Sequence, residues 1–210
     1  MLGLDPATLI SRAIVLVIAF TIHEFSHALS AKLLGDFTAE RAGRLTLNPL
    51  AHLDIAGTLA ILFIGFGWGK ACPYNPYNLK NQRWGPALIG LAGPLSNILS
   101  GIVFTIIAGL LIKYSAASTS DMVIQFFILL AMLNFGLTLF NLIPVPPLDG
   151  SKLLLALVPE RNIELKEQIQ KNGQTFLMVL VFLSIIGLNV FGFIANTAQW
   201  GVEKIISLII

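Results

Sequence analysis

The chain has 210 residues, of which 56% are apolar and only 11% are charged, and its mean hydropathy is +0.83. These values lie far outside the range of soluble domains and predict a polytopic membrane protein. The formal net charge of +2 is too small, and the basic residues too scattered, to suggest a nucleic-acid partner. Cys72 is the only cysteine, which excludes an intrachain disulfide framework and any multi-cysteine metal site.

The first apolar run, about residues 9–34, is long enough to span a bilayer, which needs roughly 20 residues. It carries the sequence HEFSH at 23–27. Residues i and i+4 of a helix share a face, so His23 and His27 can ligate one metal ion while Glu24 reaches a metal-bound water. An accidental match, or a polar cluster that joins helices, is the alternative. Ionisable groups inside a membrane span are costly, which favours metal binding.

A second apolar run, residues 55–66, is too short to span and is interrupted by glycines. Its path can be judged from charge, because Lys and Arg accumulate on the cytoplasmic side of short loops. If the run enters the membrane and returns, only Arg12, Lys113 and Lys204 of the 13 lysines and arginines lie outside. A crossing divides them more evenly. We therefore predict a re-entrant segment and an external N-terminus.

Two further spans are predicted at about 86–112 and 122–146. Each has a stripe of small or polar side chains at helical spacing, namely Gly93, Asn97 and Gly101 in one and Asn134, Thr138 and Asn141 in the other. Small residues let helices approach closely, and buried amides often join helices. Asn97 and Asn134 are interpreted as such contacts or as support for a site, with a role in substrate binding or access as a further interpretation of Asn97.

The sequence NLIPVPPLDG at 141–150 opens the backbone after the third span. Its three prolines cannot continue regular helical hydrogen bonding. Irregular backbone at membrane depth is tolerated only inside protein or beside a wet cavity, and Gly150 permits a sharp change of direction. Asn141 is closest to this opening, so it is the candidate for stabilising an oxyanion.

A catalytic zinc site takes three protein ligands and a water, so one ligand besides the two histidines is needed. Asp149 is a candidate, although aspartate at this position would also suit the N-cap of a helix over 151–158; we favour the ligand. His52 is the competing third ligand, because histidine is the commonest metal ligand. Substrate binding or control of access are the other roles open to His52.

The polar stretch at 160–174 predicts a short solvated helix, and a fourth span follows at about 174–196. The tail, 200–210, is too short to cross alone, so it either prolongs the last helix or lies at the interface. The expected fold is an all-α polytopic membrane protein with about four transmembrane helices, a re-entrant or short membrane-embedded segment, and an interfacial C-terminal helix.

We expect one membrane-embedded domain over 1–210, with a core at 9–158 and accessory helices at 159–210. In this arrangement the first and third long helices end on the same membrane face. Asp149 can therefore meet the two histidines only if the run at 55–66 turns back without crossing.

The motifs HEFSH and NLIPVPPLDG, in this order and on helices of this orientation, resemble the site-2 protease family of intramembrane zinc metalloproteases. The sequence GPLSN at 93–97 is similar to that family as well. The resemblance implies hydrolysis of peptide bonds within or near transmembrane segments of membrane proteins, with one Zn²⁺ per chain. It implies that His23, His27 and Asp149 bind zinc and that Glu24 is the catalytic base. Asn141 matches an asparagine to which the family assigns substrate or oxyanion contacts.

The alternative function is a non-proteolytic membrane protein that binds or transports a metal ion. A transporter would be expected to show repeated halves or a polar path on both sides of the membrane, and the sequence shows neither. A protein that only binds would not need Glu24. We therefore predict a protease in membrane lipid whose partner is a transmembrane protein or peptide, located in a prokaryotic cytoplasmic membrane with its site toward the cytoplasm.

Overall fold

The structure is a computed structural model that describes residues 6–57, 60, 68–115 and 121–210. The described residues form helices joined by turns and contain no strand, so the predicted all-α class is confirmed. Among them, three helices are long and apolar enough to cross a membrane. These are α1 (Pro6–Leu33), α4 (Gly85–Tyr114) and α5 (Met122–Asn141), which correspond to the first three predicted spans.

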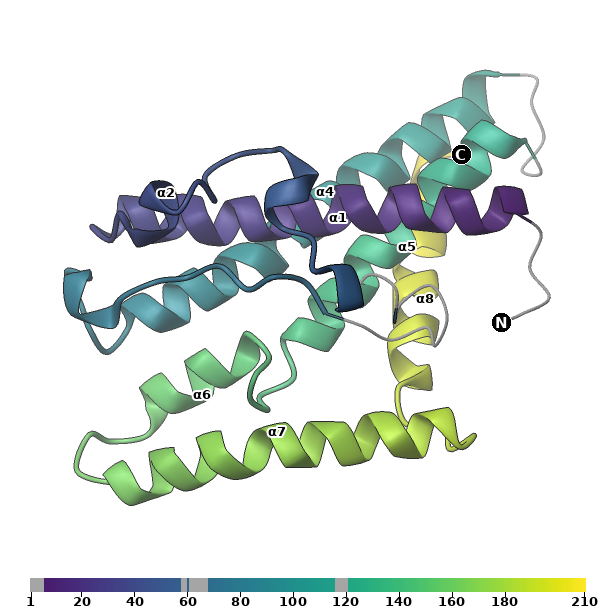
Figure 1. The fold of residues 1–210 in the computed structure, drawn as a ribbon. Coiled ribbons are helices and arrows are strands. Elements are labelled where there is room, and N and C mark those ends of the chain that lie inside the picture. Colours follow the sequence, from purple (N-terminus) through teal and green to yellow (C-terminus); the bar gives the residue numbers. More distant parts are fainter. Residues whose placement is uncertain (1–5, 58–59, 61–67, 116–120) are drawn as a thin grey trace.

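Helix α4 is the centre of the bundle. It packs against α1, α5, α6 (Gly150–Leu157) and α8 (Gly192–Ile209), and Figure 1 shows α1, α4 and α5 running together. Glycines let these helices approach closely, since a Cβ would come within 3.0 Å of another segment's atoms at Gly90, Gly93, Gly101 and Gly109. Small residues at helix contacts serve this purpose in lipid, where the helices gain little from hydrophobic association.

The end of α1 and the beginning of α4 lie at the same end of the bundle. The backbone N–H of Lys80 donates to the carbonyl of Leu34 across 3.1 Å. The buried carboxylate of Asp36 binds the backbone N–H groups of Thr38 and Asn75 at 3.1 and 2.7 Å. It thereby joins α2 (Thr38–Arg41) to η2 (Pro76–Asn78). Because the end of α1 lies beside the beginning of α4, these two helices run antiparallel.

The predicted re-entrant run at 55–66 lies largely outside the described residues, but its flanks are described. The backbone N–H of Lys70 donates to the carbonyl of His52 across 2.9 Å, just after η1 (Pro49–Ala51). Gly57 and Trp68 are so close that a Cβ on Gly57 would lie 1.9 Å from the Trp68 carbonyl oxygen. The two flanks therefore meet, and the chain reaches α4 on the side where it left α1.

Helix α5 ends at Asn141, earlier than the predicted end at 146. Pro144 has no N–H to donate to the carbonyl of Phe140, and its ring disfavours a helical conformation at the preceding residue. The turn that follows brings Gly150 against the carbonyl oxygen of Leu142, which a Cβ would approach to 2.3 Å. Gly150 is therefore required because the backbone segments approach closely. The sequence suggested that it permits a sharp change of direction, but its φ is not positive.

The prediction of one continuous helix over 174–196 is wrong. Helix α7 (Ile163–Ile185) already contains most of the polar stretch that was expected to form a separate helix. The chain then turns at Gly187, whose φ of 103° favours glycine. The apolar tail belongs to α8, which packs on α4 and α5; Figure 1 shows α8 extending from the end of α7 toward these two helices.

Large apolar side chains cover the outer faces of the spanning helices, with Ile10, Leu99, Val103 and Val123 all more than half exposed. Polar side chains take the inner positions, among them His23, Asn97, Asn134 and Thr138. This inverted distribution suits a lipid environment, in which polar groups must find partners inside the protein. The chain is an integral membrane protein.

Candidate metal centre

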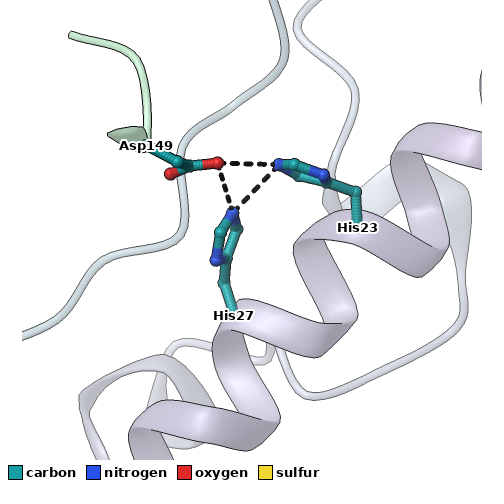
Figure 2. Close-up of side chains that lie close together, drawn as sticks. All are labelled: His23, His27 and Asp149. Carbon is teal, nitrogen blue, oxygen red and sulfur yellow. Dashed lines mark hydrogen bonds and ion pairs between the residues drawn. The ribbon is translucent and has the colours of Figure 1, made fainter. Parts of the chain in front are cut away.

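Three buried side chains from distant parts of the sequence meet inside the bundle (Figure 2). His23 and His27 stand one turn apart on α1, with their Nε2 atoms 3.0 Å apart. Asp149, which follows the turn after α5, places its Oδ2 at 3.1 Å from both Nε2 atoms. Each of the three residues is at most 7% exposed. Among the described residues, these three form the group that can hold a metal ion.

The tautomer of His27 is set by α4. Its Nδ1 lies 2.6 Å from the carbonyl oxygen of Ile89, which can only accept a hydrogen bond, so Nδ1 carries the proton. In the neutral ring, Nε2 then presents a lone pair to His23 and Asp149. Two imidazole nitrogens and a carboxylate oxygen thus converge with too few hydrogens to form a hydrogen bond at each contact. A cation between the three atoms would relieve the repulsion between their lone pairs.

The spacing of the three atoms fits zinc. Ligand atoms of a tetrahedral site with bonds of about 2.0–2.1 Å lie about 3.3–3.4 Å apart, and the three separations here are 3.0, 3.1 and 3.1 Å. Two imidazoles and one carboxylate are also a ligand set of catalytic zinc sites, which leave a fourth position for water. His23, His27 and Asp149 can therefore hold such an ion.

The second carboxylate oxygen of Asp149 is held by a lysine. Lys152 places its Nζ 2.8 Å from Oδ1 and 5.6 Å from the centre of the Tyr74 ring. Burial disfavours the charged form of Asp149, but the positive charge of Lys152 beside Oδ1 favours it and holds the pKa of this carboxyl below its ordinary value. Asp149 is therefore ionised at neutral pH.

Asp149 occupies the N-cap position of α6, as the alternative interpretation required, but its side chain makes no capping hydrogen bond. Its oxygens are directed to the two histidines and to Lys152 instead. The hydroxyl of Ser151 donates to the carbonyl of Leu148 across 2.6 Å. Asp149 therefore stands at the cap position of α6, but its carboxylate contacts the two histidines and does not cap the helix.

Glu24 lies next to His23 on α1 and is 7% exposed. Its Oε2 is buried and has no hydrogen-bond partner among the described residues. Buried polar atoms without a partner are uncommon and are often found at functional sites. This oxygen is free to accept a proton from a water molecule beside the cluster.

Gly93 lets α4 lie against the two imidazoles. A Cβ at this position would come within 2.6 Å of Cε1 of His23 and of Cε1 and Nε2 of His27. Any side chain on Gly93 would therefore displace the rings. The stripe of small residues that the sequence shows on this span thus accommodates the site as well as the neighbouring helix.

The other predicted site residues lie outside the three-residue cluster. His52 is 1% exposed, and its Nε2 donates to the carbonyl of Thr46 across 2.8 Å, so it holds its own loop. Asn141 donates its side-chain N–H to the carbonyl of Leu137 across 3.0 Å. Asn97 is fully buried and lies 3.1 Å from Nδ1 of His23.

Lys152 was not singled out by the sequence reasoning, which treated it only as a charge that reports topology. The signal was present, because Lys152 stands three residues after Asp149 at the start of a predicted helix, and such residues are neighbours on one helix face.

Cys72 takes no part in the cluster. Its burial and the nearby Glu24 carboxylate raise the pKa of its thiol to about 12, so the thiol stays protonated.

Comparison with known proteins agrees with this geometry. Residues 107–185 match the family model Peptidase family M50. The chain is 38% identical over 199 residues to "Putative zinc metalloprotease YwhC" of Bacillus subtilis (strain 168), which covers 93% of this chain and 90% of that protein. No solved structure gives a significant match.

More distant similarity extends to other bacteria and to an archaeon. Rip2 of Mycolicibacterium smegmatis, named in the same way as YwhC, is 33% identical over 183 residues, which cover 82% of this chain and 66% of Rip2. "Zinc metalloprotease MJ0392" of Methanocaldococcus jannaschii is 26% identical over 179 residues, which cover 84% of this chain and 43% of that protein.

A helical membrane bundle that buries two histidines and an aspartate beside an unpartnered glutamate defines the class as a membrane-embedded metalloprotease. The chain belongs to peptidase family M50, the site-2 proteases. The family resemblance drawn from the two motifs is confirmed, and with it a membrane-protein substrate and a lipid environment.

Proposed function

We propose that the protein hydrolyses peptide bonds within or near transmembrane segments of membrane proteins, using one zinc ion bound by His23, His27 and Asp149. The observation that carries the proposal is the convergence of one ligand atom from each residue within 3.0–3.1 Å in a buried position. Membership in peptidase family M50 supports the reaction, and the names of the relatives support zinc. The catalytic core is residues 9–158, and 159–210 are accessory.

When bound, zinc supplies a Lewis acid that polarises a peptide carbonyl and activates a water molecule. Glu24 accepts a proton from the water as the water oxygen bonds to the carbonyl carbon. It then gives this proton to the amide nitrogen as the C–N bond breaks. Its unpartnered Oε2 supports this role, because no other hydrogen bond has to be broken first.

Asn141 is proposed to donate its side-chain N–H to the oxygen that becomes negative in the reaction. It now donates to the carbonyl of Leu137 at the end of α5, so this role requires the amide to exchange one acceptor for another. Its position just before the turn that carries Asp149 supports the assignment.

A transmembrane substrate hides its peptide bonds in helical hydrogen bonds, since lipid offers no other partners. The substrate segment must therefore unwind before cleavage. This requirement favours substrates with weak helices at the cleavage site, as expected for regulated intramembrane proteolysis.

Two observations support a cytoplasmic membrane with the site toward the cytoplasm. Only Arg12, Lys113 and Lys204 of the 13 basic residues fall on the opposite side in the proposed topology, and the relatives come from bacteria and an archaeon. In intact cells, a membrane-impermeant maleimide is expected to label Lys113→Cys and to leave Lys171→Cys unlabelled, both in a Cys72→Ala background. The reverse pattern would invert the topology.

The central experiment compares wild type with Glu24→Gln after purification in detergent. Zinc per chain is measured by mass spectrometry, and cleavage is measured on a membrane-spanning reporter. One zinc ion is expected in both proteins, with cleavage by the wild type alone. Cleavage by Glu24→Gln, or wild-type protein that takes up no zinc, would overturn the proposed mechanism.

The third ligand is tested by separate replacement of the two candidates. Asp149→Ala is expected to lose zinc, whereas His52→Ala is expected to keep it, because the His52 ring binds the Thr46 carbonyl. Thermal unfolding of both proteins shows whether either has lost its fold. Zinc retained by Asp149→Ala and lost by a folded His52→Ala would exchange the two roles.

A further inference from the structure

Asn97 is a buried amide of α4 that contacts the cluster from behind. Its side chain is 0% exposed, and its amide Nδ2 lies 3.1 Å from Nδ1 of His23. This ring nitrogen is the one that does not face His27 and Asp149. Asn97 stands four residues after Gly93, on the same face of α4, so the glycine admits the imidazoles and the amide meets one of them a turn further along.

The chemistry of His23 favours the amide oxygen, in place of the nitrogen, at this contact. A neutral imidazole has one donor nitrogen and one acceptor nitrogen. If Nε2 gives its lone pair to a metal ion, Nδ1 must carry the proton, and the atom opposite Nδ1 must be an acceptor. The amide oxygen of Asn97 meets this requirement, and its NH₂ group does not.

The hydrogen bonds around Asn97 allow this orientation. Half a turn of the amide exchanges its oxygen and nitrogen without moving any other atom. Among the described residues, the buried side-chain atoms without a partner are Glu24 Oε2, Asn97 Oδ1 and Asn134 Oδ1. All three are acceptors. Placing the Asn97 oxygen on the N–H of His23 gives that oxygen a partner. The NH₂ group of Asn97 then points into an interior in which the unpartnered atoms are acceptors.

We propose that Asn97 is a positioning residue whose amide oxygen accepts a hydrogen bond from Nδ1–H of His23 and fixes the tautomer that offers Nε2 to the metal. The inference rests on the proposed role of His23 as a zinc ligand. It parallels the hydrogen bond of His27 to the Ile89 carbonyl, so α4 sets both rings, one through its backbone and one through a side chain. Partners of this kind strengthen a histidine ligand and fix its direction.

The competing interpretation is a contact that only joins α1 and α4, with the NH₂ group of Asn97 donating to Nδ1. The two interpretations make opposite predictions for Asn97→Asp, since a carboxylate accepts hydrogen bonds and cannot donate one when ionised. An accepting partner is preserved by this change. A donating partner is lost.

The test is a competition titration of zinc against a chelator of known affinity, with wild type, Asn97→Asp, Asn97→Leu and Asn134→Leu. The last variant is the matched control, because Asn134 is also a fully buried amide and donates to its own helix at Leu130. Asn97→Leu is expected to weaken zinc binding by about 10–100-fold, the usual effect of removing such a partner. Asn97→Asp should bind at least as tightly as wild type, and Asn134→Leu should stay close to wild type.

Equal weakening by Asn97→Asp and Asn97→Leu, with zinc still bound by wild type, would reject the positioning role and leave the proposed site intact. Wild type that binds no zinc would reject the proposed site itself. A measurement without variants covers the case in which a variant fails to fold. The protein has three histidines, so their ¹⁵N-labelled rings can be followed by NMR in the zinc-loaded protein. His23 should keep a proton on Nδ1, and its zinc-induced chemical-shift change should occur at Nε2. A proton on Nε2 of His23 would overturn the inference.

Discussion

At the scale of single residues, the two oxygens of Asp149 have different partners. Oδ2 faces both histidines at 3.1 Å, and Oδ1 lies 2.8 Å from the ammonium group of Lys152. A carboxylate held in this way offers one oxygen to a metal ion and keeps the other engaged. Lys152 is therefore expected to fix the direction of the ligand as well as to balance its charge.

Lys152→Met should weaken zinc binding by about tenfold, because Oδ1 loses its partner and the carboxylate gains freedom to rotate. The measurement is a chelator competition in detergent. Lys171→Met, an exposed change on α7, is the control and should bind zinc as wild type does. Equal affinities for Lys152→Met and wild type would show that the lysine is dispensable for the geometry.

Some of these residue relations were predictable from sequence and others were not. The separation of His23 and His27 by four residues defines a shared helix face whatever the rest of the chain does. The sequence favoured Asp149 over His52 as the third ligand, and the tertiary structure brings Asp149, not His52, to the two histidines. The hydrogen bond of His52 to Thr46 depends on a loop whose path no local rule fixes.

At the scale of the helices, the site depends on how closely α4 approaches α1. The distance is set by Gly93, whose missing side chain leaves room for the two imidazoles. The small-residue stripe indicated a close contact on this span. The sequence could not show that the contact was with the histidines, because the partner of a stripe depends on how the helices are arranged.

Gly93→Ala should reduce zinc binding and lower stability by about 1–3 kcal/mol, the usual range for overpacking a tight contact. Its Cβ would come within 2.6 Å of both rings. Gly136→Ala on α5 is the matched control, because its Cβ would meet only Ile194 Cγ2 at an ordinary 3.9 Å. Zinc content and the thermal unfolding midpoint are measured for both. If the two variants behave alike, close approach at Gly93 is not a requirement of the site.

The short helices on the same side as the end of α1 are joined by Asp36. Burial raises the pKa of this carboxyl, but hydrogen bonds from Thr38, Asn78 and Asn75 outweigh burial and hold the pKa below its ordinary value. A depressed folded-state pKa means that the stabilisation is present above the unfolded pKa of about 3.9 and is lost as the pH falls through the folded value.

Asp36→Asn should therefore lower stability by about 1–3 kcal/mol at neutral pH, because an amide cannot accept all of these hydrogen bonds and leaves a buried donor unpaired. The difference from wild type should shrink as the pH is lowered below about 4. Thermal unfolding midpoints across this pH range provide the measurement. A difference that grows on acidification would contradict the assigned role of the carboxylate.

The helix boundaries show where sequence reasoning was weakest. Hydropathy located the first three spans because apolar length is what a bilayer requires. It failed after residue 173, since the apolar residues of α7 and α8 form one run while the chain turns at Gly187 between them. A single glycine inside an apolar run does not show whether the helix is continuous.

At the scale of the whole molecule, the cluster connects distant parts of the chain. His23 and Asp149 are 126 residues apart in sequence, and they belong to α1 and to the turn before α6. A metal ion between them would hold together the two segments that flank α4 and α5. Binding that occurs only in the folded state stabilises that state.

Removal of zinc by a chelator is expected to lower the thermal unfolding midpoint of the wild-type protein, and added zinc should restore it. At a free zinc concentration 100 times the dissociation constant, the stabilisation is about 2.7 kcal/mol. His23→Ala should show no response to chelator or zinc, because it lacks one ligand. The same chelator response in His23→Ala would mean that zinc stabilises the protein at another place.

The contact between the flanks of residues 58–67 has a consequence for how the family can diversify. His52 and Lys70 share a backbone hydrogen bond, Gly57 adjoins Trp68, and the Arg44 guanidinium donates to the carbonyls of Ala51 and Lys70. These contacts fix the flanks, 52–57 and 68–70, relative to each other. A change in the number of residues between Gly57 and Trp68 therefore need not change the register of α4 against α1, because the entropic cost of a longer loop grows only slowly with its length. The metal cluster can therefore keep its geometry in relatives whose chains differ in length at this place.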